Sequence, residues 1–302
     1  MNISSALERV PDVEFLLDEP LARHTTFRVG GPVRLLARPR SQSALCALLE
    51  QIRDSDIPFV VLGGGSNVLA LDGPWEMAVI QLHLACNEVR SEQRTKGQTI
   101  LYAGAGTKLQ ELIRCSIENG LEGLESLSGI PGTVGGALVM NAGTPSGAIS
   151  DNLLRVDLVD RDGRRCSVRR EELTPGYRTM GIEENSIVLG ACFKLGPCPS
   201  EILKGRAEQV LRNRRRTQPL RYPSAGSIFK NPEGQFAGAL IEKAGLKGYR
   251  IGDAEVSRKH ANWIVNRGSA SARDILCLIK KIENEIFGTF GVRLEREIRI
   301  LE

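Results

Sequence analysis

The chain has 302 residues, of which 41% are hydrophobic and 25% are charged. This composition excludes global disorder, and the length allows two or three globular domains. The formal net charge of +4 is too small to require nucleic acid as a partner. Glycine is the outlier: 32 residues are glycine, well above a usual share of ~7%. Many backbone positions must therefore need a positive φ or a close approach of other atoms.

The N-terminal segment has no apolar core, so we do not expect a signal peptide. The window 126–150 is uncharged, but its glycines and prolines argue against a helix in lipid. Seven scattered cysteines without a CxxC pair favour reduced thiols in a cytoplasmic protein over disulfides or zinc. Only three histidines occur and no HExxH motif, which disfavours a metal site.

The hydrophobic pattern predicts a β-rich first region with interspersed helices. In chain order we expect a strand at 33–37, a helix after an N-cap at Ser41, strands at 59–62, 77–82 and 99–103, a helix at 108–119, a hairpin of 153–160 with 166–169 around Arg161–Arg164, and a strand at 186–195. The uncharged glycine-rich window between the last helix and the hairpin is expected to be a loop.

The segment 196–199 (GPCP) indicates a domain boundary. Beyond it we expect a helix from Ser200, a strand at 227–230, a helix at 236–244, strands near 254–256 and 262–266, a helix at 271–287 and a last strand at 292–301. The fold class is therefore α+β. We place a first region at 1–196, with two lobes of about 1–80 and 81–196, and a second domain at 197–302.

Two glycine-rich segments are the strongest local signals. The first, VVLGGGSNVL (60–69), leads an apolar strand into backbone N–H groups that no side chain covers. Such a concavity suits a phosphate, although neither the GxGxxG fingerprint nor a Walker loop is present. Its candidate ligand-binding residues are Gly63, Gly64, Gly65, Ser66 and Asn67. A flexible turn is the alternative for this segment.

The second segment is Gly129–Gly136, followed by Asn141, and it carries no charge. A diphosphate there would be held by amide dipoles, through Gly129, Gly132, Thr133, Gly135, Gly136 and Asn141. The alternative is a glycine-rich crossing of packed backbones. Two such segments in one region predict a single extended ligand that contains a diphosphate, namely a dinucleotide held outside a Rossmann fold.

A basic cluster lies between residues 204 and 221, at helical spacing. A solvated helix face is the ordinary explanation of such a cluster. Nucleic-acid binding is a second interpretation, but Tyr222 is the only nearby aromatic side chain for base stacking. A small phosphorylated substrate would need only two or three of these arginines.

Three short polar pieces are unremarkable by themselves. Tyr177 and Arg178 follow a Pro-Gly turn, and Ser227 follows Ala225-Gly226 at the start of a short apolar strand. Glu297 and Arg299 alternate with isoleucines, so we expect both on one face of the last strand. Without further information, Ser227 is a turn residue and Glu297–Arg299 is a surface ion pair.

Together these segments resemble the UDP-N-acetylenolpyruvoylglucosamine reductases (UDP-N-acetylmuramate dehydrogenases), in their compact type II form. The resemblance runs from His24 to the C-terminus. It rests on HTTFRVGG (24–31), the two glycine-rich segments, GYR (176–178), SAGSIFKNP (224–232), the stretch 237–266 and LEREIRI (294–300).

The resemblance implies an α+β fold in which a two-part FAD-binding region of the vanillyl-alcohol-oxidase (PCMH) type, residues 1–196, precedes a substrate-binding domain. It further implies that NADPH reduces non-covalent FAD and that the enolpyruvyl ether then accepts the hydride, in peptidoglycan precursor synthesis. Ser227 would be the proton donor, Arg178 the clamp of the substrate carboxylate and Glu297 the catalytic glutamate. The implied substrate contacts are Tyr177, Arg215, Arg216, Asn231, His260 and Arg299.

Two other functions remain open from the sequence. One is a hydroxy-acid or sugar oxidase of the same flavin fold, although neither glycine-rich segment contains a histidine for covalent flavin attachment. The other is a regulator that binds RNA or nucleotides through the basic cluster. Our expectation is a cytoplasmic monomer whose partners are a UDP-sugar and NADPH, with no nucleic acid, membrane or metal.

Overall fold

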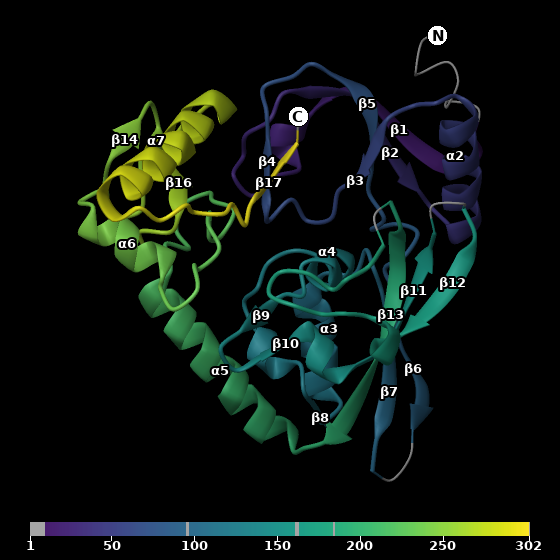
Figure 1. Ribbon diagram of the computed structural model, residues 1–302. Helices are drawn as coiled ribbons and strands as arrows, with labels where there is room; N and C mark the ends of the chain where they lie inside the picture. The colour runs from purple at the N-terminus through teal and green to yellow at the C-terminus, as the bar shows by residue number, and fades with distance from the viewer. Residues whose placement is uncertain (1–9, 95–96, 161–162, 184, 302) are drawn as a thin grey trace. The chain divides into compact units, whose positions relative to one another are not determined.

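The computed structural model describes residues 10–94, 97–160, 163–183 and 185–301, which form two compact units (Figure 1). Unit 1 contains the chain up to Leu17, Leu35–Gly64 and Met77–Asn213. Unit 2 contains Asp18–Arg34, Gly65–Glu76 and the chain from Arg214 onward. These units differ from a division at residue 196, because two early segments group with the C-terminal part. The assignment of functional domains to 1–196 and 197–302 remains a prediction.

Two sheets organise unit 1. The first comprises, in the order in which they pair, β1 Val13–Pro20, β2 Pro32–Pro39, β5 Trp75–Ile80 and β3 Phe59–Val61. Of these strands, β1, β2 and β5 each continue past the residues that belong to unit 1. The second has the order β12-β11-β13-β7-β6, and it comprises β12 Arg165–Arg169, β11 Leu153–Val159, β13 Ile187–Pro197, β7 Thr99–Gly104 and β6 Val89–Arg94. Two short strands, β9 Gly143–Thr144 and β10 Gly147–Ala148, form a separate pair, and β8 Leu121–Glu122 pairs with β13.

The predicted hairpin is confirmed by the antiparallel pairing of β11 with β12. Of its expected turn, residues 161 and 162 lie outside the described residues. The helices of this part of the chain are α2 Gln42–Asp54, α3 Leu109–Glu118, α4 Val134–Val139 and α5 Ser200–Thr217. The Oγ of Ser41 accepts a hydrogen bond from the N–H of Ala44 at 3.1 Å, which confirms the predicted N-cap of α2.

Unit 2 is built from a three-stranded antiparallel sheet, two helices and a parallel strand pair. The sheet comprises β14 Arg250–Ile251, β15 Ala254–Val256 and β16 Ile264–Asn266; the helices are α6 Ala237–Lys243 and α7 Ala272–Phe290; β17 Arg299–Leu301 pairs with β4 Val68–Ala70. A capping box starts α7: the Oγ of Ser271 accepts from the N–H of Asp274, and the Oδ2 of Asp274 accepts from the N–H of Ser271, both at 3.0 Å. The buried face of α7 carries Ile275, Leu278, Ile279, Ile282 and Ile286.

Two predicted strands of unit 2 are wrong. Residues 227–230 form only isolated bridges, because the Asn262 side chain binds both the N–H and the C=O of Phe229, at 3.0 and 2.8 Å. Residues 292–298 are not a strand either, and only β17 is regular. There the N–H groups of Glu297 and Ile298 converge on the carbonyl oxygen of Ile228, which breaks the ladder pattern. Glu297 therefore precedes β17 and does not share a strand face with Arg299.

The glycine-rich window also differs from the loop that was expected, because α4 begins inside it. Thr133 is its N-cap, with Oγ1 accepting from the N–H of Gly136 at 3.4 Å. Val134, Ala137 and Leu138 give α4 a buried face. Among the described residues, no helix is long and apolar enough to cross a membrane.

Candidate active site

The two glycine-rich segments touch each other in unit 1. A Cβ atom on Gly64 would lie 2.7 Å from the Cα of Gly132, and one on Gly63 would lie 2.7 Å from Oγ1 of Thr133. Side chains at 63 and 64 would therefore collide with the second segment. Glycine at these positions permits the direct contact of two backbones from distant parts of the chain.

Part of the second segment uses its backbone N–H groups inside unit 1. Gly129 donates to the side chain of Gln110 at 2.9 Å, and Gly135 donates to the carbonyl of Ala105 at 2.9 Å. These amides are therefore not available to a ligand. The contribution of Gly135 is close packing, since a Cβ atom there would lie 2.9 Å from that of Ala105.

Other amides of the two segments remain available for an anion. In the portion of the chain that the structure describes, the N–H groups of Gly63, Gly64 and Gly132 have no hydrogen-bond acceptor. Gly64 and Gly132 are also the two residues whose backbones touch. Backbone N–H groups without an acceptor on two touching segments can bind a phosphate, whose oxygens accept hydrogen bonds without the help of a side-chain cation.

Asn141 links the second glycine-rich segment to the Tyr177–Arg178 turn. It adopts a positive φ of 41°, and its Nδ2 donates to the carbonyl of Gly176 at 3.0 Å. Its Oδ1 is buried and has no partner among the described residues. A buried acceptor without a donor is costly, so this oxygen fits a ligand that brings an N–H or O–H group. Tyr177 is 53% exposed, and the Arg178 guanidinium lies 5.1 Å from its ring centre.

In unit 2, backbone hydrogen bonds bring the segments of Ser227 and Glu297 together. The N–H of Glu297 donates to the carbonyl oxygen of Ile228 at 2.8 Å. Asn67 is bonded to the Glu297 segment at two points. Its side-chain Nδ2 donates to the backbone carbonyl of Glu297 at 3.0 Å, and its backbone carbonyl accepts from the N–H of Arg299 at 3.0 Å. The predicted cofactor residue Asn67 thus fixes the position of the predicted catalytic glutamate.

Two other predicted substrate contacts lie in the same unit. The Oδ1 of Asn231 accepts from the N–H of Ala237 at 3.1 Å and so anchors the start of α6. His260 is half-buried, and its Nδ1 is buried without a partner among the described residues. Burial and the positive charge of Lys247 hold the pKa of His260 below its usual value, so its imidazole is neutral at neutral pH.

The basic end of α5 contains three successive arginines in different environments. Arg215 and Arg216 are exposed. Burial lowers the pKa of Arg214, and its Nε is buried without a partner in the described part of the chain. The Nζ of Lys259 donates to the carbonyl oxygen of Arg215 and thereby ties the end of α5 to the loop before β16.

Arg214 belongs to the run 214–216, one of whose arginines the family resemblance makes a candidate contact of the substrate diphosphate. Its partial burial could have been anticipated from helical spacing, since it lies seven positions after the buried Ala207 on the same helix. A half-buried guanidinium whose buried Nε has no partner among the described residues fits an anionic ligand.

Comparison with known proteins identifies the class. Residues 33–169 match the FAD binding domain, and residues 218–301 match the C-terminal domain of UDP-N-acetylenolpyruvoylglucosamine reductase. Glucooligosaccharide oxidase from Acremonium strictum shares the fold, with a TM-score of 0.51, 15% identity and coverage of 99% of this chain and 60% of that one. The chain is therefore a flavin-dependent oxidoreductase with an FAD-binding region of the vanillyl-alcohol-oxidase (PCMH) type.

Relatives over the full length specify the family. UDP-N-acetylenolpyruvoylglucosamine reductase of Syntrophobacter fumaroxidans is 54% identical over 98% of this chain and 86% of its own length, and that of Moorella thermoacetica is 44% identical over 95% and 93%. The crystal structure of the Thermus caldophilus enzyme has a TM-score of 0.79 and 38% identity, over 96% of this chain and 99% of that chain. The chain belongs to the UDP-N-acetylenolpyruvoylglucosamine reductase family.

Proposed function

We propose that this chain reduces UDP-N-acetylenolpyruvoylglucosamine to UDP-N-acetylmuramate with NADPH, a step of peptidoglycan precursor synthesis. Family membership supports the reaction class. The observation that carries the assignment of residues is the hydrogen bond from the N–H of Glu297 to the carbonyl of Ile228, the residue after Ser227. It holds the proposed proton donor and the proposed catalytic glutamate on adjoining segments of unit 2.

The residues that would hold FAD fit a diphosphate ligand with hydrogen-bond donors. Gly63, Gly64 and Gly132 would direct N–H groups at the diphosphate, and Asn141 would accept from the cofactor through its buried Oδ1. Bound FAD supplies the redox chemistry, which transfers a hydride equivalent from NADPH to the substrate. Gly65, Ser66, Asn67, Gly129, Thr133, Gly135 and Gly136 complete the proposed cofactor-binding set.

The proton chemistry falls to side chains of this protein. Addition of a hydride to the vinyl CH2 carbon leaves a carbanion on the ether carbon, delocalised into the adjacent carboxylate as an enolate. Ser227 would donate its hydroxyl proton to that carbon, which completes the lactyl ether. A serine is a weak acid, but the enolate of a carboxylate is a strong base, so the position of the hydroxyl matters more than its acidity.

Arg178 and Glu297 would act on the substrate carboxylate. The guanidinium of Arg178 can bind it with two hydrogen bonds and stabilise the negative charge that grows during hydride addition. Glu297 would orient or polarise the carboxylate for proton transfer. Substrate binding is assigned to Tyr177, Arg215, Arg216, Asn231, His260 and Arg299.

We further propose that residues 1–196 bind FAD and residues 197–302 bind substrate, in a cytoplasmic monomer. The matched segments, 33–169 and 218–301, fall within these two ranges. The reaction is tested by anaerobic titration of the yellow protein with NADPH and then with the enol ether. We expect bleaching of the flavin absorbance, its stoichiometric return and formation of UDP-N-acetylmuramate; a flavin that is never reoxidised by the enol ether contradicts the proposal.

The flavin is expected to be bound without a covalent bond. Neither glycine-rich segment carries a histidine or a cysteine that could attach it. Acid precipitation should therefore release FAD into the supernatant, where its absorbance and chromatographic mobility identify it. Yellow colour that stays with the precipitated protein would contradict this prediction.

Reversal of charge at Arg215 is expected to affect the UDP substrate more than FAD. Arg215 lies in unit 2, whereas Gly63, Gly64 and Gly132 lie in unit 1. Arg215→Glu should raise the KM for the enol ether about 10-fold or more, because one charge-assisted hydrogen bond becomes a repulsion, with little change in flavin content. Arg212→Glu on the same helix is the control, since Arg212 is exposed and pairs with Glu208 at 3.3 Å. An equal loss of FAD in the Arg215 variant would show that Arg215 serves the cofactor.

A further inference from the structure

The segment 24–31 carries part of the family resemblance, yet none of its residues has a role in the proposed reaction. Within unit 2 it packs directly on the end of the first glycine-rich segment. A Cβ atom on Gly65, whose φ is 59°, would lie 2.0 Å from the carbonyl oxygen of His24. The N–H of Thr26 donates to the carbonyl oxygen of Gly65 at 3.0 Å. The turn at Thr26 is therefore fixed against a residue of the proposed cofactor-binding set.

Thr26 also holds the segment that leads to Ser227. Its Oγ1 lies 2.6 Å from the carbonyl oxygen of Ser224 and 3.3 Å from that of Gly65. A hydroxyl has one proton to donate, so the shorter distance marks the stronger hydrogen bond, the one to Ser224. The N–H of Ser224 donates back to the carbonyl oxygen of Thr26 at 3.1 Å. Thr26 thus bonds both backbone groups of Ser224 and also the carbonyl of Gly65.

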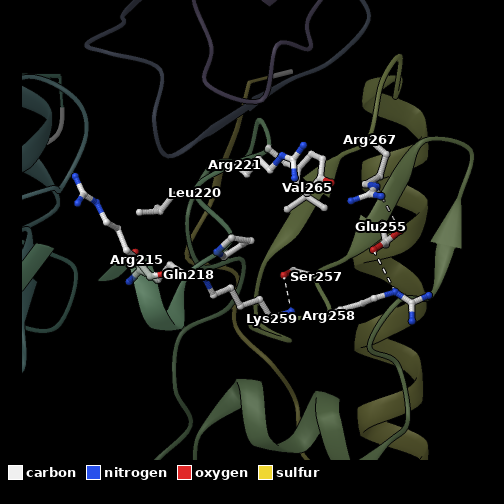
Figure 2. A pocket seen from close by; sticks show the side chains of 12 residues that line it. Arg215, Gln218, Leu220, Arg221, Glu255, Ser257, Arg258, Lys259, Val265 and Arg267 are labelled. Carbon is white, nitrogen blue, oxygen red and sulfur yellow. Dashed lines mark hydrogen bonds and ion pairs between the residues drawn. The ribbon is translucent and has the colours of Figure 1, made fainter. Parts of the chain in front are cut away.

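The chain enters this turn beside a pocket of unit 2. Figure 2 shows the pocket, and Arg221 and Val265 are among the residues that line it. After it, the carbonyl of Pro223 accepts from the N–H of Asn266 at 2.9 Å. Thr26 is not among the described residues that line the pocket. Its hydroxyl therefore acts on the turn itself and not on the pocket.

Only two residues separate Ser224 from Ser227. Ala225 is buried, and Gly226 has a φ of 79°, a conformation that glycine adopts without a clash of a Cβ atom. Because the backbone reverses at this point, the place where the turn starts determines where the Ser227 hydroxyl lies. The hydroxyl of Thr26 is the side-chain group that fixes this start.

The chain after Ser227 is bonded independently of Thr26. The N–H of Ile228 donates to the carbonyl of Asn262 at 2.9 Å, and the carbonyl of Ile228 accepts from the N–H of Glu297 at 2.8 Å. Loss of the Thr26 hydroxyl should therefore leave the Glu297 segment in place and free only the upstream side of Ser227.

We infer that Thr26 is a positioning residue for proton transfer. Its hydroxyl holds the turn 224–227 against Gly65 and so fixes the hydroxyl of Ser227. The inference rests on the proposed function, in which Ser227 donates the proton, and in this role Thr26 acts through Ser227. The neighbouring Thr25 differs, because its Oγ1 donates to the carbonyl of Val29 at 2.7 Å and accepts from the N–H of the same residue at 3.2 Å. Thr25 therefore stabilises only its own turn.

Thr26→Val in the flavin-loaded full-length protein tests the inference. Valine is of nearly the same size and keeps both backbone hydrogen bonds of residue 26, but it has no hydroxyl proton. The rate of reoxidation by saturating enol ether should fall about 10–100-fold, since a misplacement of ~1 Å can cost ~10²-fold in rate. Flavin content, reduction by NADPH and the KM for the enol ether should change little. Thr26→Ser, which restores the hydroxyl, should restore the rate, and Thr289→Val, the same change at an exposed position of α7, is the control.

A double variant separates positioning of Ser227 from a general loss of structure. If Thr26 acts through Ser227, adding Thr26→Val to Ser227→Ala should slow reoxidation no further, because the positioned group is already absent. Effects of the two substitutions that multiply would overturn the inference. Normal reoxidation of Thr26→Val, or a slow Thr26→Ser variant, would overturn it as well.

Hydrogen exchange of the resting protein tests the anchor without turnover. Backbone amides of 224–227 should exchange about 10-fold faster in Thr26→Val than in the wild type, the effect of one hydrogen bond, whereas those of α7 should be unchanged. Equal exchange of the turn in both proteins overturns the inference whatever the reaction is. A wild-type protein that does not reduce the enol ether, in which the valine variant still exchanges faster, would contradict the proposed function and not the anchoring of the turn by Thr26.

Discussion

Ser227→Ala should be reduced by NADPH at nearly the wild-type rate and reoxidised by the enol ether about 10²–10⁴-fold more slowly, the usual effect of removing a positioned acid. The proton of Ser227 is needed only in the reaction of the reduced enzyme with the enol ether, because NADPH has only to deliver a hydride. Ser227 follows Gly226, which has a φ of 79°, and it fills no core volume, so its replacement by alanine should leave the fold intact. Stopped-flow absorbance of the flavin measures the two half-reactions separately.

Glu297→Gln should likewise be reduced by NADPH at nearly the wild-type rate and be reoxidised by the enol ether much more slowly than the wild type. Its backbone N–H still donates to the carbonyl of Ile228, so the segment is held while the carboxylate charge is lost. Ser269→Ala serves as the control, since Ser269 is an exposed residue of the same unit and is not among the proposed site residues. If Ser227→Ala is reoxidised as fast as the control, Ser227 is only a turn residue.

The second large effect is expected at Gly64. Its Cβ atom in Gly64→Ala would lie 2.7 Å from the Cα of Gly132, a backbone atom that cannot rotate away. The two glycine-rich segments must then separate, which moves the N–H groups proposed to bind FAD. We expect loss of most bound flavin and a lower free energy of unfolding by about 1–3 kcal/mol, as for overpacked sites. Flavin content per protein and a thermal melt measure the two effects, and Gly64→Asp should be more severe.

Gly205→Ala in α5 is the matched control for this substitution. A Cβ atom at Gly205 would meet nothing within 4 Å, and alanine is preferred over glycine in a helix interior. This variant should keep its flavin and gain up to about 1 kcal/mol of stability. If Gly64→Ala keeps its flavin as Gly205→Ala does, the contact between the two segments is not needed for cofactor binding.

The sequence predicts well where local signals decide the structure. Ser41 and Ser271 mark the starts of α2 and α7, because an N-cap hydroxyl acts on the next turn of the same helix. The pairing of β11 with β12 could also be predicted, since it joins neighbouring segments. Such features depend on residues that lie close together along the chain.

Tertiary contacts explain the features of the structure that differ from the sequence-based predictions. Residues 227–230 have a strand-like composition, but the distant side chain of Asn262 occupies the backbone groups of Phe229 that a ladder would need. The contact of Gly64 with Gly132 likewise joins two segments whose proximity no local pattern encodes. Arg214, Arg215 and Arg216 are the same residue type in succession, and among them Arg214 is half-buried while its two neighbours are exposed.

The central claim is that this chain reduces the enolpyruvyl ether and that Ser227 supplies the proton. Its most direct test mixes the NADPH-reduced, anaerobic enzyme with UDP-N-acetylenolpyruvoylglucosamine in a stopped-flow spectrophotometer, for wild type and for Ser227→Ala. The account predicts that the flavin absorbance returns in the wild type with one equivalent of UDP-N-acetylmuramate, and that the variant is slower by about 10²-fold or more. No return of absorbance in the wild type, or equal rates in the two proteins, would contradict it.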